Sequence, residues 1–146
     1  MRTLVPLLVI LTCSGLSVRG PAASTQAASP PASVPECGPM GASSMRTTLY
    51  FGLNRKRGSV SEGQWRSFLR DRVTPRFPQG LTVWEANGQW RRADGVIVRE
   101  PAKVLLLVHD DSPAVKAAIL AIIEDYKKAF EQESVLWETA RVCATF

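Results

Sequence analysis

The residues best suited to chemistry in this chain lie at the two ends of one apolar segment, residues 103–108. His109 follows that segment and precedes Asp110-Asp111, so the sequence places an imidazole beside carboxylates. Neighbouring carboxylates raise the pKa of a histidine and suit it to general-base chemistry. A turn histidine with no catalytic role is the simpler interpretation, because the sequence spaces no nucleophile or second acid near it.

Glu100 is the second candidate for acid–base chemistry, at the entrance to the same segment. An ion pair with Arg99 or Lys103 on the surface is its simpler interpretation. The alternative is a pocket in which the Glu100 carboxylate and the Tyr50 phenol line one open sheet face. The sequence alone assigns neither Glu100 nor His109 a reaction, so both remain candidates only.

Aromatic side chains provide candidates for ligand binding by stacking. Trp84 and Trp90 flank Asn87-Gly88, the dipeptide most typical of a tight β-hairpin. Together with Tyr50 they are the candidate ligand-binding residues, suited to a sugar or an aromatic ligand. The simpler alternative for the two tryptophans is a cross-strand aromatic pair, worth up to about 1 kcal/mol.

The N-terminus predicts export. Arg2 precedes an apolar run over residues 4–11, which is the pattern of a secretory signal and is too short to span a bilayer. Cys13 follows Ile10-Leu11-Thr12, which resembles a bacterial lipidation motif except for its threonine. Two alternatives remain open: lipidation of Cys13, or cleavage after a small residue between Gly15 and Ala23. Either places the mature chain in the periplasm or cell envelope.

Cys37 and Cys143 remain as an even pair after processing, in a compartment that permits oxidation. We therefore predict a disulfide between them, closing a loop of about 100 residues and worth up to about 4 to 5 kcal/mol. Free thiols and an intermolecular bridge are the alternatives. No metal site is predicted, since these cysteines and His109 lack the spacing of ligands.

Composition divides the chain into three parts. A signal peptide is expected over residues 1–22, and an Ala/Ser/Pro-rich tether over 23–45, because such a segment buries too little apolar surface to fold. One domain is expected over 46–146.

The net charge is +5, and the domain carries sixteen basic and twelve acidic side chains. No dense basic face with interleaved aromatics is visible, so no nucleic-acid partner is predicted. Arg55-Lys56-Arg57 is interpreted as a solvated turn. Bulk charge still favours attraction to anionic ligands or envelope surfaces.

Periodicity predicts the order β-α-β-β-α-β. Strands are expected over residues 48–53 and 103–108, and the second is apolar on both faces as a central strand should be. Helices are expected to begin at Ser61, the start of a capping box, and at Ser112-Pro113. The order predicts a ferredoxin-like α+β sandwich with a four-stranded antiparallel sheet and two helices on one face. An extra hairpin is expected in the middle, at Asn87-Gly88.

Several separated motifs of the domain occur in a recognisable order. They are Thr48-Leu49-Tyr50-Phe51-Gly52-Leu53-Asn54, Trp65, Phe68, Phe77-Pro78 with Gly80-Leu81-Thr82, Gly88-Gln89-Trp90, Glu100, and Phe130 with Gln132-Glu133-Ser134-Val135. Together they resemble the bacterial family of domains of unknown function numbered 3574, whose members are mostly small exported or envelope proteins. The resemblance implies export and a shared domain, and it supplies no catalytic residues.

The leading hypothesis for function is a non-enzymatic binding or interaction module of the envelope, because no catalytic constellation accompanies the export signal. Its partner would be a small molecule or an envelope protein, without a cofactor, and with membrane contact only through a lipid anchor. The alternative is a cofactor-independent enzyme or small-ligand protein of the dimeric α/β-barrel type. In that alternative two open sheet faces pack in a homodimer and enclose a cavity.

Overall fold

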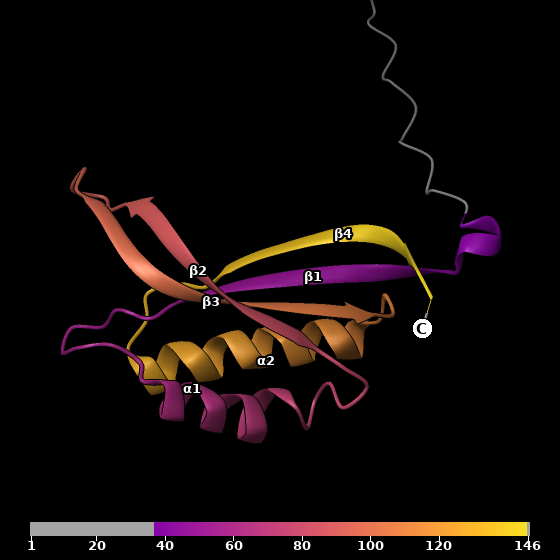
Figure 1. Ribbon diagram of the computed structural model, residues 1–146, viewed down its shortest axis with the longest axis horizontal. Helices are drawn as coiled ribbons and strands as arrows, with labels where there is room; N and C mark the ends of the chain where they lie inside the picture. The colour runs from indigo at the N-terminus through magenta and orange to yellow at the C-terminus, as the bar shows by residue number, and fades with distance from the viewer. Residues whose placement is uncertain (1–36, 146) are drawn as a thin grey trace, which may run out of the picture. The chain divides into compact units, whose positions relative to one another are not determined.

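A computed structural model describes residues 37–145 (Figure 1). The predicted signal peptide, Cys13 and most of the predicted tether lie outside the described residues. The elements are the short 3-10 helix η1 (Gly38–Met40), β1 (Ala42–Gly52), α1 (Glu62–Phe68), the π-helical turn η2 (Leu69–Val73), β2 (Thr82–Arg91), β3 (Ile97–His109), α2 (Pro113–Phe130) and β4 (Leu136–Ala144). None of the helices within 37–145 is long and apolar enough to cross a membrane.

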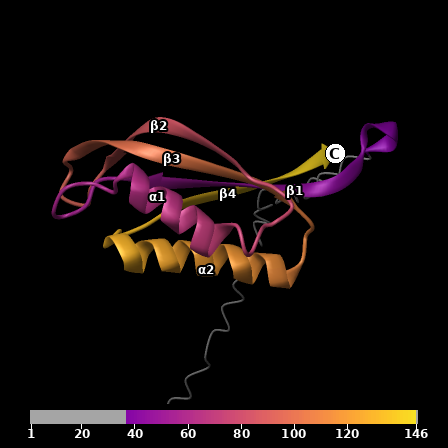
Figure 2. The same cartoon turned by 60° about the horizontal axis from the view of Figure 1, so that its bottom comes forward.

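The four strands form one antiparallel sheet in the order β2-β3-β1-β4. The most apolar strands are therefore central, and both helices lie on one face (Figures 1 and 2). Leu49 of β1 lies opposite Leu105 of β3 and Trp137 of β4, which fixes the register of the helix-covered face. The predicted ferredoxin-like α+β architecture is confirmed.

Local sequence signals position both helices. Ser61 Oγ accepts a hydrogen bond from the Gln64 backbone N–H at 3.3 Å, and Gln64 Oε1 accepts from the Ser61 N–H at 3.0 Å. This reciprocal pair is the predicted capping box, and it satisfies donors that the first helical turn leaves free. Ser112 Oγ accepts from the Val115 N–H in the same way, and Pro113 opens α2. Both predicted helix starts are confirmed.

The core lies between the helices and the central strands. Its fully buried members include Leu49, Phe51, Trp65, Val73, Leu105, Leu107, Ile119, Ile122 and Tyr126. The ring centroids of Phe51 and Tyr126 are 4.6 Å apart, and the Tyr126 hydroxyl donates to the Gly52 carbonyl oxygen at 2.8 Å. Burial raises the pKa of Tyr126, because the ionised phenolate loses hydration in the core. The aromatic contacts join α2 to the end of β1.

The prediction of an extra hairpin at Asn87-Gly88 is wrong. Both residues lie inside β2, where Asn87 pairs with Pro101 and Gly88 with Glu100. The chain turns instead near Asp94, whose carboxylate accepts from the Val96 N–H at 3.1 Å, while Gly95 has a φ of 86°. A side-chain turn followed by a glycine in the left-handed region favours reversal there. One long β2–β3 hairpin results.

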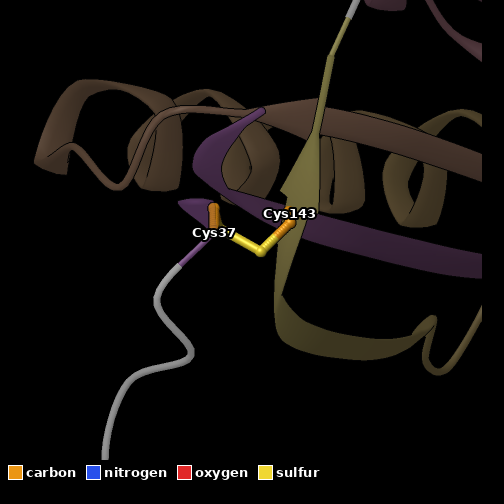
Figure 3. The surroundings of a disulfide bond; sticks show 2 residues. All are labelled: Cys37 and Cys143. Atoms are coloured by element: carbon orange, nitrogen blue, oxygen red, sulfur yellow. A yellow bond between two sulfur atoms is a disulfide. The ribbon is translucent and has the colours of Figure 1, made fainter. Parts of the chain in front are cut away.

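The folded region begins before the expected start at residue 46. β1 begins at Ala42, and Ser43 pairs with Cys143 in β4. The predicted disulfide between Cys37 and Cys143 is confirmed, with the Cα atoms 5.4 Å apart (Figure 3). The bridge and the pairing to β4 together order residues whose composition alone indicated a tether.

Candidate functional site

A pocket of about 380 Å³ opens where β3 ends and α2 begins, on the helix-covered side of the sheet. We call it the His109 pocket. It is lined by Met45, Thr47, His109, Asp110, Asp111, Ser112, Lys116, Ile119, Trp137 and Thr139. These residues come from β1, β3, the first turns of α2, β4 and the segment between β3 and α2. The pocket therefore brings together parts of the chain that are remote in sequence.

His109 is fixed in this pocket through both ring nitrogens. Its Nδ1 lies 2.7 Å from the Asp110 carbonyl oxygen, and its Nε2 lies 2.9 Å from Thr47 Oγ1. A carbonyl oxygen only accepts hydrogen bonds, so Nδ1 carries the proton and, in the neutral ring, Nε2 accepts from the Thr47 hydroxyl. Thr47 is fully buried, so its hydroxyl is closed to solvent. The imidazole is an oriented and fully hydrogen-bonded group.

Trp137 contributes an unpaired donor to the lining. Its indole Nε1 is buried and forms no hydrogen bond within residues 37–145. A buried donor without a partner costs about 1 to 3 kcal/mol, so native proteins rarely leave one without a water or a ligand. Trp137 therefore brings a buried donor without a partner among the described residues to the edge of the pocket.

The charges around the pocket nearly balance. Asp111 is neutralised by Arg141, whose Nη2 lies 2.8 Å from Oδ2. Asp110 and Lys116 form no salt bridge within the described part of the chain, so they leave one negative and one positive group available. Met45 and Ile119 add apolar surface. The site combines one charge of each sign with an apolar wall.

The predicted ligand-binding residues lie elsewhere, on the face of the sheet that the helices leave open. In the register Trp84 and Tyr50 flank Val104 from the two neighbouring strands. The Tyr50 hydroxyl donates to Glu138 Oε1 at 3.0 Å, and this bond raises the pKa of Tyr50. Trp84 and Trp90 belong to the same strand, so the predicted cross-strand tryptophan pair is wrong. The structure does not bring these residues to His109.

Glu100 holds the β2–β3 hairpin to the end of β1. Its Oε1 accepts from the Trp90 indole N–H at 3.0 Å, and its Oε2 accepts from the Asn54 backbone N–H at 3.0 Å. The carboxylate lies over Gly52, where a Cβ would be 2.7 Å from both oxygens. Because both oxygens are engaged, Glu100 acts as a structural clamp, and the expected ion pair with Arg99 or Lys103 is wrong.

Lys103 instead faces the helices and is nearly buried. Its Nζ lies 2.7 Å from Glu62 Oε2 and 2.9 Å from Glu85 Oε1. The hydrogen bonds to these carboxylates raise the pKa of Lys103, and the same contact lowers the pKa of Glu62.

Within residues 37–145 no group of three metal-ligating side chains is found.

Sequence reasoning identified His109 but missed Thr47 and Lys116. Thr47 pairs with Leu107 on one side and Thr139 on the other, so its side chain shares a face with His109 two residues further along β3. Alternation along each strand indicates which residues share a face. The register between strands decides which residues become neighbours across the sheet, and these residues carry no local signal for it.

The fold and the pocket define a single α+β domain with an antiparallel four-stranded sheet. The chain belongs to the family described as "Protein of unknown function (DUF3574)", which matches residues 46–146. No curated protein matches the chain by sequence.

Two solved structures of a phage SAM lyase share the fold. The complex with S-methyl-5′-thioadenosine is 15% identical with a TM-score of 0.55, and the apo state is 14% identical with a TM-score of 0.51. Each match covers 71% of this chain and 92% of the lyase chain. CutA from Synechococcus elongatus, complexed with Bis-Tris, is 12% identical with a TM-score of 0.42, over 71% of this chain and 83% of its own. For the two lyase structures the likeness at these identities is one of fold alone.

Proposed function

We propose that this protein is an exported binding protein of the cell envelope whose small-molecule ligand occupies the His109 pocket. The observation that carries the proposal is a pocket of about 380 Å³ whose lining includes Trp137, a residue with a buried indole N–H that has no partner within residues 37–145. Pockets of this size with a few placed polar groups are the usual small-ligand sites of proteins. The Cys37–Cys143 disulfide supports an oxidising compartment, and the predicted export signal and the lipid anchor at Cys13 are further parts of the proposal.

The lining suggests the chemistry of the ligand. A carbonyl or carboxylate oxygen would accept from the Trp137 N–H, an anionic group would be attracted to Lys116, and an amine to Asp110. The apolar part would pack on Met45 and Ile119. A small zwitterion or monocarboxylate fits this combination, whereas a multiply charged anion would be repelled by Asp110, which has no salt-bridge partner among the described residues.

Binding without turnover is supported by the state of His109. Both of its ring nitrogens are already hydrogen bonded, and the hydroxyl that Nε2 contacts belongs to the buried Thr47. A general base needs a free lone pair within reach of substrate. A turnover that depends on His109 or Glu100 would therefore contradict this proposal.

Native mass spectrometry of the mature protein, purified from its own envelope, tests the site. We expect an additional bound mass that is lost in Trp137→Phe and retained in Trp84→Phe, whose indole lies on the other face of the sheet. The Trp137 indole N–H resonance, assigned by the same variant, should shift when small carboxylates and zwitterions are added. A protein that carries no extra mass and whose Trp137 resonance responds to none of these compounds would refute the proposal.

The open sheet face supports a second candidate, the homodimer. Trp84 is 42% exposed and Leu136 is 63% exposed on this face, beside the buried Val104. Pairing two such faces would cover these side chains and enclose Tyr50. Light scattering should then report a dimer that Leu136→Asp dissociates and Leu120→Asp, on α2, leaves intact. A strictly monomeric protein at high concentration would exclude this candidate.

A further inference from the structure

The free end of the β2–β3 hairpin exposes large apolar side chains to solvent. Trp90 is 42% exposed, Val96 52% and Ile97 45%. Only six large hydrophobic residues within 37–145 are exposed, so half of them lie on this short stretch. Leaving such surface in water is unfavourable by about 25 cal/mol per Å², and a cluster of it commonly marks an interaction site.

The same stretch is basic. Residues 89–99 contain Arg91, Arg92 and Arg99 and a single acidic residue, Asp94. Arg92 is paired with Asp94 at 3.0 Å, whereas Arg91 and Arg99 form no salt bridge with any described residue. Two guanidinium groups therefore remain available beside the exposed apolar side chains. Arg91 lies directly opposite Ile97 in the register.

The hairpin end is held in shape. The Arg92 N–H donates to the Val96 carbonyl oxygen at 2.9 Å, and the Gly95 N–H donates to the Arg92 carbonyl oxygen at 3.0 Å. At its base, Glu100 fixes the indole of Trp90. Figure 1 shows this end extending past the helix layer and away from it, so nothing within the described residues covers it. A preorganised, accessible tip loses little conformational freedom on binding.

We infer that this hairpin tip, residues 89–99, docks the protein on an anionic lipid surface. The Val96 and Ile97 side chains would enter the acyl boundary. Arg91 and Arg99 would bind lipid phosphates, to which guanidinium groups donate paired hydrogen bonds. A nucleic acid would satisfy the arginines but provides no apolar phase for Val96 and Ile97, so it is the less suitable partner.

Vesicle flotation tests this inference on the mature chain without a lipid anchor. We expect binding to vesicles of equal parts phosphatidylcholine and phosphatidylglycerol, and weak binding to phosphatidylcholine alone. Each basic residue near an anionic surface contributes about 1 kcal/mol, so Arg91→Gln with Arg99→Gln should weaken binding about 30-fold. Val96→Ser with Ile97→Ser should weaken it about tenfold, by removing the inserted apolar surface.

A matched control removes two exposed basic residues of the helix layer, Arg72→Gln with Lys128→Gln, and should leave vesicle binding unchanged. All variants are at exposed positions, and circular dichroism would verify that each is folded. If the control variant loses as much vesicle binding as the hairpin variants, bulk charge alone would explain the binding, and the inference would be overturned. Binding to duplex DNA as strong as to anionic vesicles, or no binding to either, would overturn it as well.

Discussion

Replacing Gly52 by alanine should destabilise this domain through one side chain, Glu100. A Cβ at position 52 would lie 2.7 Å from both carboxylate oxygens and 2.8 Å from Cδ, closer than carbon and oxygen atoms approach. The backbone on either side is held by the sheet, so the carboxylate must move. Moving it breaks the hydrogen bonds from the Trp90 indole and the Asn54 N–H.

The size of the effect follows from two opposing terms. Two hydrogen bonds to a carboxylate that is partly open to solvent contribute about 1 kcal/mol each, the usual value for a hydrogen bond, because solvent weakens the effect of the charge. Alanine in a strand is favoured over glycine by about 0.5 to 1 kcal/mol. Gly52→Ala should therefore lower the unfolding free energy by about 1 to 1.5 kcal/mol. In Glu100→Ala the carboxylate no longer fills the space beside residue 52, so adding Gly52→Ala should stabilise the domain by about 0.5 to 1 kcal/mol.

Urea unfolding of the four proteins in this double-mutant cycle measures the coupling, which we expect to be about 2 kcal/mol. Gly63→Ala is the matched control, because its Cβ would meet nothing closer than Ser61 Oγ at 3.9 Å, and it should not destabilise. If Gly52→Ala costs the same with and without the Glu100 carboxylate, the proposed clamp does not exist.

Two further perturbations probe other parts of the domain. Cys37→Ser with Cys143→Ser opens a loop with a sequence separation of 106 and should lower the unfolding free energy by up to about 5 kcal/mol, seen in urea unfolding; an unchanged midpoint would contradict this. Glu62→Gln with Glu85→Gln removes both carboxylates that pair with the nearly buried Lys103 ammonium and should lower the midpoint of urea unfolding. Since the pKa of Glu62 is lowered below its ordinary 4.5 and that of Lys103 raised above 10.5, the contribution of this cluster should be full between those values. This contribution to stability should be lost as the pH falls through the lowered pKa of Glu62 or rises through the raised pKa of Lys103. A Lys103→Met protein whose stability depends on pH in the same way as that of the parent would refute this prediction.

The sequence alone determined the helix starts, the strand order and the disulfide. Ser61 and Ser112 act on backbone groups within three residues of themselves, so their capping roles are encoded locally. The doubly apolar run 103–108 predicted a central strand, because both of its faces must be covered. The Cys37–Cys143 disulfide was predicted from the number of cysteines expected in the mature chain, since one pair has one intramolecular connectivity.

The tertiary structure decided the hairpin and the function of Glu100. Asn87-Gly88 is a strong local turn signal, yet pairing with the long β3 keeps it inside β2 and moves the reversal to Asp94-Gly95. Glu100 was expected on the surface or in a pocket. Its carboxylate is instead engaged by Trp90 and Asn54, and the latter is 46 positions away in the chain.

The His109 pocket also depends on tertiary structure alone. Thr47 and His109 are 62 positions apart and meet only because the β1–β3 register brings them to neighbouring positions of one face. Trp137 joins them from β4, across β1. Side-chain alternation is a property of each strand and can be read from its residues, whereas register is set by the packing of the whole sheet against its helices. For this reason the sequence indicated the residue types of the site, and the fold alone determined which of them meet.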